Sequence, residues 1–383
     1  MLDSKNAIVI VGSGLAGYNL AQEFRKLDTE TPLIIITGCD GRYYYKPSLS
    51  NALVKEQVPA TFAMADADKM RQRLNAVIHT HTQVTHIDSK QHQIQTPNQT
   101  IHYSKLVLAC GAKTVTPVVK GSPPAFHSIN NLQDYELLRH SLTGKKRITI
   151  LGSGFVGCEF ANTLLNAGYA VDIVAPARYP LEQLLPEAVG LVLKQGLADK
   201  GARWYLQDVV TEVVDQGKDY QVTLASNTTF STDLILSTIG LRPNVELAET
   251  AGLDFNRGIQ VNRHLQTSAD DIYALGDCAE VEGLVLQFVA PLLQSSRALA
   301  KTLAGETTPV NYPAMPIVLK TPACPLTLLP PPANCDGEWE ITGDDINLKA
   351  VFVDEQQRLR GFALTGTAVT EKTALSKSIP GLL

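Results

Sequence analysis

The stretch "ITILGSGFVGCEFANTLLNAGYAVDIVAP" (residues 148–176) decides the fold, because residues 7–37 carry nearly the same pattern as "AIVIVGSGLAGYNLAQEF…TPLIIIT". Each copy reads as a strand, a glycine turn, a helix and a second strand. The run before each turn is apolar and rich in β-branched residues, which is typical of a parallel strand buried on both faces. The copies are too far apart for a solenoid repeat, so the sequence predicts two separate dinucleotide-binding units.

Each turn has the spacing G-x-G-x-x-G between a strand and a helix. The first glycine permits a tight turn, the second lets backbone approach a pyrophosphate, and the third lets helix and strand pack closely. Alone, such a turn can be a purely structural strand-to-helix connection. Two copies in the right context favour two dinucleotides, FAD and a nicotinamide, which exchange hydride between their rings. We expect FAD at Gly12, Ser13, Gly14, Leu15, Ala16 and Gly17, and the nicotinamide dinucleotide at Gly152, Ser153, Gly154, Phe155, Val156 and Gly157.

An acid at the end of the second strand of such a unit usually binds the ribose hydroxyls. In the first unit Asp40 is the nearest acid and comes slightly late. The second unit has Ala175 and Pro176 at that place, followed by Arg178, which would tolerate a 2′-phosphate. The choice between NADH and NADPH therefore stays open at this level.

Three further strings end in glycine turns after predicted strands. "YALGDCAE" places Gly276 and Asp277 where a glycine and a carboxylate can meet a flavin's ribityl chain, although Asp277 can equally cap the next element. "LACGA" (108–112) resembles a chain crossing beside a flavin, with Ala109 and Gly111. "DLILSTIGLRPN" (233–244) contains Gly240, which we expect beside the nicotinamide dinucleotide.

Bulk properties narrow the class of protein. The chain has 383 residues, 44% hydrophobic and 19% charged, which fits a globular protein of two or three domains. A formal net charge of −5 argues against broad binding to nucleic acid or anionic membranes. The start "MLDSKN" does not look like a signal peptide, and the apolar segment "LVLQFVAPLL" (284–293) is too short to insert into a membrane. A cytoplasmic protein is the expectation.

The cysteines and histidines predict no metal site. Cysteines stand at 39, 110, 158, 278, 324 and 335, without a C-x-x-C pair or histidines at zinc spacing. The expectation is reduced, mostly structural thiols. "HTHTQVTH" (79–86) alternates as a strand does, so its histidines are expected at the surface or in the core rather than around a metal ion.

The pattern beyond the glycine turns predicts a discontinuous arrangement. We expect an α/β protein with two Rossmann-like three-layer domains and a small α+β C-terminal domain. The expected boundaries are 1–113 with 240–308 for FAD, 114–239 for NAD, and 309–383 for the third domain. A helix is predicted at "LLQSSRALAKTLAG" (292–305), and the alternation in "NLKAVFVDEQQRLRGFALTG" (347–366) indicates strands in the tail.

In this order, the motifs resemble the two-dinucleotide flavoprotein reductases of the glutathione-reductase-like superfamily over essentially the whole chain. Within it, "DGRYYYKPSLS" (40–50), "VLKTPACPL" (318–326) and "GCEFAN" (157–162) resemble the rubredoxin reductases of bacterial alkane hydroxylation. That resemblance implies electron transfer from NADH through tightly bound FAD, one per chain, to the single iron of rubredoxin.

The resemblance also implies residue roles. It places three charged residues near the isoalloxazine: Lys46, Glu159 and Lys320. A lysine there stabilises the anionic reduced flavin, and a neighbouring glutamate orients that lysine as an ion pair. Without the resemblance, Glu159 would be interpreted as an acid that the helix dipole favours in the first turns of a helix. The two lysines would be interpreted as solvated surface charges. The complete FAD set adds, to the glycine-turn residues, Asp40, Arg42, Lys46, Pro47, Val84, Ala109, Gly111, Glu159, Gly276, Asp277, Val289 and Lys320.

One departure from the superfamily bears on mechanism. Disulfide reductases have a cysteine pair beside the flavin, and relatives that act on peroxides have a single cysteine shortly after the first unit's second strand. Here that stretch supplies Ser48 and Ser50, while Cys39 comes too early. Flavin N5 would therefore accept hydride from NADH, and the electrons would leave singly to an outside acceptor, with no side chain acting as nucleophile or base.

Alternatives remain at this level. A reductase of the same design for ferredoxin or flavorubredoxin has the same motifs, and the missing cysteine disfavours an NADH oxidase. A redox-signalling flavoprotein like the apoptosis-inducing factors is the rival from another class. Rubredoxins are acidic, so a basic patch is expected near the flavin, drawn from Arg42, Lys46, Arg297 and Lys320. The oligomeric state stays open, with a monomer favoured.

Overall fold

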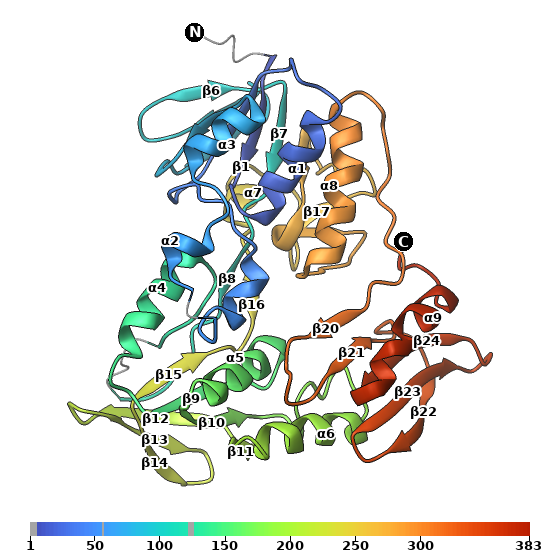
Figure 1. Ribbon diagram of the computed structural model, residues 1–383. Coiled ribbons are helices and arrows are strands. Elements are labelled where there is room, and N and C mark those ends of the chain that lie inside the picture. Colours follow the sequence, from blue (N-terminus) through green and yellow to red (C-terminus); the bar gives the residue numbers. More distant parts are fainter. Residues whose placement is uncertain (1–5, 56, 122–125) are drawn as a thin grey trace.

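The first dinucleotide unit is built on a parallel sheet (Figure 1). The computed structural model describes residues 6–55, 57–121 and 126–383, so the starting residues "MLDSK" lie outside it. Strand order is β18-β7-β1-β2-β3, and all four neighbouring pairs are parallel. The strands are β1 (Ile8–Val11), β2 (Leu33–Ile36), β3 (Val77–His79), β7 (Lys105–Leu108) and β18 (Ile272–Ala274).

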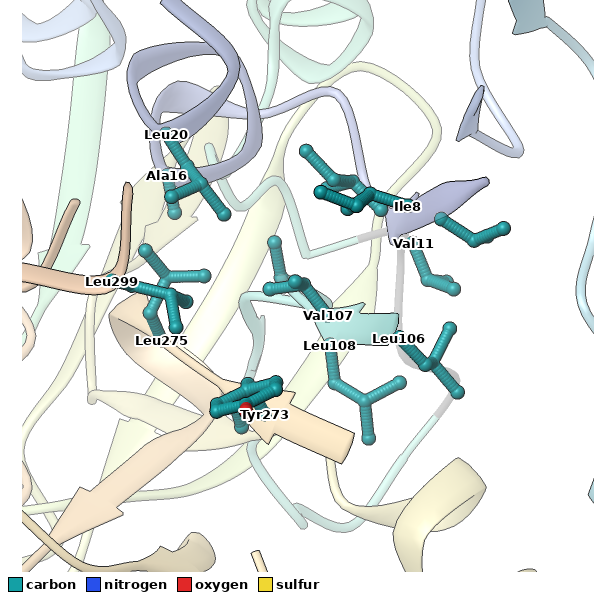
Figure 2. Close-up of a cluster of buried hydrophobic side chains, with 14 of the residues drawn as sticks. Ile8, Val11, Ala16, Leu20, Leu106, Val107, Leu108, Tyr273, Leu275 and Leu299 are labelled. Atoms are coloured by element: carbon teal, nitrogen blue, oxygen red, sulfur yellow. The ribbon is translucent and has the colours of Figure 1, made fainter. Parts of the chain in front are cut away.

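Helices bury the faces of this sheet, as its apolar strands require. Helix α1 (Leu15–Arg25) packs against α8 (Val289–Leu303), the helix predicted for 292–305. Figure 2 shows side chains of β1, β7, β18 and both helices converging in one core. Its labelled members include Ile8, Val11, Leu20, Val107, Leu275 and Leu299. The remaining elements here are α2 (Pro59–Phe62), α3 (Ala67–Leu74) and the small antiparallel sheet β4 (His86–Asp88), β5 (Gln93–Gln95) and β6 (Thr100–His102).

The second unit has its own parallel sheet, in the order β11-β10-β9-β15. Its strands are β9 (Arg147–Leu151), β10 (Ala170–Ala175), β11 (Arg203–Leu206) and β15 (Leu234–Ser237). Helices α4 (Leu132–Ser141), α5 (Phe155–Asn166) and α6 (Glu187–Ala198) accompany it. An antiparallel sheet of β12 (Val210–Asp215), β13 (Tyr220–Leu224) and β14 (Thr229–Thr232) completes the unit.

The chain leaves the first unit after β7 and returns to it for β18. Both crossings run through one two-stranded ribbon, β8 (Ala112–Thr114) paired antiparallel with β16 (Leu241–Pro243). The returning chain adds α7 (Glu246–Thr250), β17 (Ile259–Val261) and β19 (Ala279–Val281) to the first unit. This path has the discontinuous form that we expected, while the numbered domain boundaries stay predictions.

The tail forms a third sheet, in the order β20-β21-β24-β23-β22 with every pair antiparallel. Its strands are β20 (Ile317–Leu319), β21 (Leu326–Leu329), β22 (Gly337–Asp344), β23 (Asn347–Asp354) and β24 (Leu359–Thr365). The 3₁₀ turn η4 (Gly366–Glu371) and α9 (Lys372–Ser378) lie beyond β24. The predicted strands at 347–366 are β23 and β24, and the fold class expected from the sequence is confirmed.

One predicted strand is wrong. "HTHTQVTH" alternates, but only His79 belongs to β3 and only His86 to β4, with a loop between them. His81 has φ +50°, a left-handed conformation that ends extended pairing. Alternating residues make a strand only where a neighbouring strand accepts their hydrogen bonds.

In the part of the chain that the structure describes, we find no helix with the length and apolar character needed to cross a membrane. All six cysteines are free in the structure, and Cys158, Cys278 and Cys324 are buried.

An ion pair between a buried carboxylate and a half-exposed guanidinium in the second sheet gives a stability prediction. Asp172 on β10 is 1% exposed, and Arg203 on β11 donates two hydrogen bonds to it, of 2.6 and 2.8 Å. Arg203→Ala removes both hydrogen bonds that the arginine gives to that carboxylate, so we expect the free energy of unfolding in urea to fall by about 1–3 kcal/mol. Arg73→Ala, at an exposed position on α3, is the control. Equal stability of the two variants would contradict the prediction.

Candidate functional site

The first glycine turn is shaped by backbone contacts at its first and third glycines. Gly12 has φ +118°, and a Cβ there would lie 2.2 Å from the carbonyl oxygen of Ala109. A Cβ on Gly17 would lie 2.0 Å from the carbonyl oxygen of Gly12. By contrast, a Cβ on Gly14 would have nothing within 4 Å. The middle glycine therefore faces open space, where a pyrophosphate can approach the backbone.

The second turn repeats this geometry. Gly152 has φ +103°, with the carbonyl oxygen of Thr238 2.8 Å from an added Cβ. A Cβ on Gly157 would meet the Gly152 carbonyl oxygen at 2.2 Å, and one on Gly154 would again meet nothing. Helices α1 and α5 both begin after the middle glycine without a side-chain cap or an acid in the first turn. Their first N–H groups are thus available to an anion at the positive helix end.

The other predicted turn residues line the two sites differently. Ser13 and Ala16 are buried in the first turn, and the Ser13 hydroxyl donates to Thr37 Oγ1 at 2.9 Å. In the second turn Ser153 is buried, while Val156 is exposed. The remaining members, Leu15 and Phe155, are the first residues of α1 and α5.

Asp40 lies in the loop after β2, beyond the carboxyl end of the first sheet. Arg42 donates from its backbone N–H and its Nε to the two carboxylate oxygens, at 3.1 and 2.7 Å. Burial opposes ionisation of Asp40, but these hydrogen bonds outweigh it and hold its pKa below the ordinary value. Asp40 is therefore an ionised acceptor at the edge where a ribose of the first dinucleotide would lie. Arg178, considered for a 2′-phosphate, is paired with Glu182.

Lys46 begins the 3₁₀ turn η2 (Lys46–Asn51). Its ammonium donates to Asn130 Oδ1 at 2.6 Å and lies 3.9 Å from Asp277 Oδ2. Burial lowers the pKa of Lys46 and raises that of Asp277, and the attraction between the two charges opposes both shifts. The structure thus brings together Lys46 and Asp277, two predicted site residues from opposite ends of the first unit.

The carboxylate of Glu159 accepts hydrogen bonds from a second group of residues. Ser50 donates its hydroxyl to Glu159 Oε2 at 2.6 Å, and the Lys320 ammonium lies 3.0 Å from the same oxygen. The backbone N–H of Lys320 donates to Glu159 Oε1 at 3.1 Å, and its ammonium also contacts the Pro47 carbonyl. Glu159 comes from α5, Ser50 and Pro47 from η2, and Lys320 directly follows β20. All three parts of the chain meet at this carboxylate.

The remaining predicted residues lie at strand ends or beside helices. Gly276 and Asp277 form the 3₁₀ turn η3 (Gly276–Cys278) after β18, and Gly276 has φ +79°. Gly111 and Gly240 have φ +68° and +123° with open space where a Cβ would stand. The last three are Ala109, which is buried after β7, Val84, which is buried after β3, and Val289, which opens α8.

Sequence reasoning missed two residues of this site. Asn130, which precedes the N-cap residue of α4, is the hydrogen-bond acceptor of Lys46, and nothing in the local sequence marks it. Thr238 supplies the carbonyl that requires glycine at 152, and its hydroxyl donates to Leu151 O at 2.7 Å. In the string "STIG" (237–240) only the glycine marks a site in the sequence, so the role of Thr238 was not predicted. In residues 6–55, 57–121 and 126–383 no group of three or more acidic, histidine or cysteine side chains is placed to hold a metal ion.

Comparisons with known proteins match this architecture. The profile of the pyridine nucleotide-disulphide oxidoreductases matches residues 6–300, and that of a rubredoxin binding C-terminal domain matches residues 309–379. A rubredoxin-NAD(+) reductase of Alcanivorax borkumensis is 46% identical over 98% of this chain and 99% of its own length. One of Acinetobacter baylyi is 44% identical, with 98% of each covered. The ferredoxin reductase for the CYP199A2 system from Rhodopseudomonas palustris superimposes with a TM-score of 0.88 at 25% identity, covering 98% and 95%.

The contrast between the glycines gives a prediction about the first turn. Gly14→Ala has room for its methyl group and an ordinary φ of −68°, so the flavin-free protein should keep its melting temperature. The methyl group would occupy the approach to the pyrophosphate, so FAD affinity should fall at least about tenfold. Gly17→Ala would push its methyl group against the carbonyl of Gly12, so it should lower both the melting temperature and the FAD affinity.

Fluorescence titration of flavin-free protein with FAD, together with thermal unfolding, checks both variants. Gly154→Ala is the matched control, because it should weaken NADH binding and leave FAD affinity unchanged. A Gly14→Ala protein that binds FAD normally would show that this turn does not hold the pyrophosphate.

Proposed function

Because this chain belongs to the pyridine nucleotide-disulphide oxidoreductase family and ends in a rubredoxin binding domain, we propose that it passes electrons from NADH through FAD to rubredoxin. The observation that carries the proposal is the full-length likeness to two rubredoxin-NAD(+) reductases. The convergence of all three parts of the chain on Glu159 supports it, because it brings the third domain against α5, which follows the second turn, and against η2 of the first unit.

The residues present fit both dinucleotides. The open middle glycines and uncapped helix starts of α1 and α5 can each accept a pyrophosphate. FAD supplies a group that accepts hydride and returns its electrons singly. Lys46 and Lys320 place positive charge where η2, α5 and β20 meet, and Asp277 offers a carboxylate to polar groups of the cofactor. The chain's own side chains hold and orient the two dinucleotides, and none of them acts as a nucleophile.

The acceptor lies outside the chain. At the stretch where peroxide-reducing relatives of this superfamily carry a cysteine, Ser50 instead donates a hydrogen bond to Glu159. A hydroxyl in that place cannot exchange with a disulfide, because that chemistry needs a thiolate. Electrons that reach the centre therefore continue to a separate protein.

The structure revises the basic patch expected for that protein. Lys46 and Lys320 are engaged with Asn130 and Glu159, and Arg42 is paired with Asp40, which leaves Arg297 exposed on α8. The third domain offers different cations. A groove of about 580 Å³ lies between the segment before β20 and α9, with Lys372 and Lys377 on its wall.

This groove suits an acidic partner with an apolar contact point. Val318, which is 50% exposed, lines it together with Pro316 and Ile379. Val318 comes two residues before Lys320, so the strand that lines the groove leads directly to the lysine that contacts Glu159. We assign it as the docking surface for rubredoxin.

A supply of electrons to an alkane hydroxylase, a cytoplasmic location and a monomeric chain are further parts of this proposal. The resemblance of "KTPACP" to the rubredoxin reductases of alkane hydroxylation supports the first.

The acceptor is tested by stopped-flow spectroscopy of the flavin-loaded protein. NADH should bleach the flavin, and subsequent mixing with oxidised rubredoxin should restore the flavin colour while the iron absorbance falls. Parallel mixing with a ferredoxin and a flavorubredoxin tests the rival acceptors. Flavin that is reduced by NADH but leaves rubredoxin oxidised would refute the assignment, and a faster reaction with ferredoxin would replace it.

The docking surface is tested by Lys372→Ala/Lys377→Ala. We expect KM for rubredoxin to rise about threefold to tenfold and kcat/KM to depend less on salt, since steering by exposed charges is screened. Lys200→Ala/Lys218→Ala removes two exposed lysines of the second unit and should change neither quantity. Identical behaviour of the two double variants would exclude the groove as the docking surface.

A further inference from the structure

Asn130 is fixed by three hydrogen bonds at the point where the chain enters α4. Its Nδ2 donates to the carbonyl of Ala112 at 2.6 Å, and its backbone N–H donates to Asp134 Oδ2 at 2.8 Å. Its Oδ1 accepts from the Lys46 ammonium at 2.6 Å. The contacts come from β8, from α4 and from η2, so the side chain joins segments of both dinucleotide units.

These contacts determine which end of the amide faces Lys46. A carbonyl such as that of Ala112 can only accept, so it must face the NH₂ group of Asn130. The amide oxygen is then left for the ammonium. A flipped amide would set NH₂ against NH₃⁺ and oxygen against oxygen, and both contacts would be lost. The geometry therefore holds Lys46 in one direction.

The hydrogen-bond partner of Lys46 is a neutral amide, while its carboxylate neighbour Asp277 stands farther away, and this determines what the contact does. Asp277, at 3.9 Å, lies beyond hydrogen-bond distance of the ammonium. A carboxylate at 2.6 Å would cancel most of the lysine's charge, whereas an amide oxygen fixes the ammonium and leaves that charge in place. The site thus holds a partly buried cation in a defined position and leaves part of its field available to a bound group.

We propose that Asn130 is a positioning residue that holds the Lys46 ammonium at the flavin, in hydrogen-bond contact with a neutral amide rather than a carboxylate, and so raises the reduction potential of bound FAD. The inference rests on the proposed function only in requiring that FAD bind beside Lys46. A positive charge beside the flavin stabilises the reduced, anionic form of FAD. This stabilisation is smaller when the Lys46 ammonium is displaced or when a carboxylate neutralises it.

The test measures the potential of the flavin-loaded protein by equilibration with a reference dye, without rubredoxin. Asn130→Ala should lower the equilibrium constant for flavin reduction about tenfold, which for two electrons is about 30 mV. Asn130→Asp should lower it further, because the new carboxylate pairs with Lys46. Asn98→Ala, an exposed asparagine of the first unit, is the control and should leave the potential unchanged.

A second pair of variants separates positioning from a merely structural role. Lys46→Met alone should lower the potential, and adding Asn130→Ala to it should change nothing further, because the asparagine acts through the lysine. An equal shift in both backgrounds, or no shift in either, would overturn the proposal. If Asn130→Ala does not fold, the same measurements are made with Asn130→Ser.

The two proposals fail in different ways. A protein that takes up no FAD contradicts the proposed function, whereas FAD bound at a potential that Asn130 does not influence contradicts only this inference.

Discussion

The arrangement of the molecule depends on one buried carboxylate. Glu159 belongs to the second unit, yet its oxygens bind Ser50 of the first unit and both the ammonium and the backbone of Lys320 in the third. A carboxylate with this little exposure is stable only while those donors are present, since removal of one partner of a buried pair costs about 3–5 kcal/mol. The requirement to satisfy one charge therefore constrains three sheets to a common point, and that point is where the two dinucleotides are expected to meet.

The glycine turns impose the complementary constraint. In both units the outer glycines are required by carbonyl groups, which lie within about 3 Å of the place that a methyl group would take. The strand, the crossing loop and the helix are thus locked together before any ligand binds. The middle glycine is required by nothing inside the protein. That division of roles explains why one pattern can serve two different dinucleotides. We propose that the specificity between them comes from residues outside the turn, such as Asp40 in the first unit.

The sequence was informative where the determining contacts are local. Strand, turn and helix follow one another in 7–37 and in 148–176, so periodicity and glycine spacing predicted both units. It was least informative where partners are remote: Asn130 lies 84 residues from Lys46, and Lys320 lies 161 from Glu159. The resemblance supplied the three charged residues but not the asparagine, because an amide that acts through another side chain leaves no motif. The alternation at 79–86 misled because, in the described part of the chain, only its end residues His79 and His86 belong to strands that pair with neighbours.

The detour of the chain between β7 and β18 has a consequence for how the protein acquires its structure. Strand β18 completes the first sheet only after the whole second unit has left the ribosome, because the second unit lies between the two strands in the sequence. The inserted unit has a complete sheet of its own and can collapse first, whereas the amino-terminal segment must wait with one strand edge unpaired. The ribbon of β8 and β16 brings the two ends of the insert together, and this shortens the search by which the late strand finds its place.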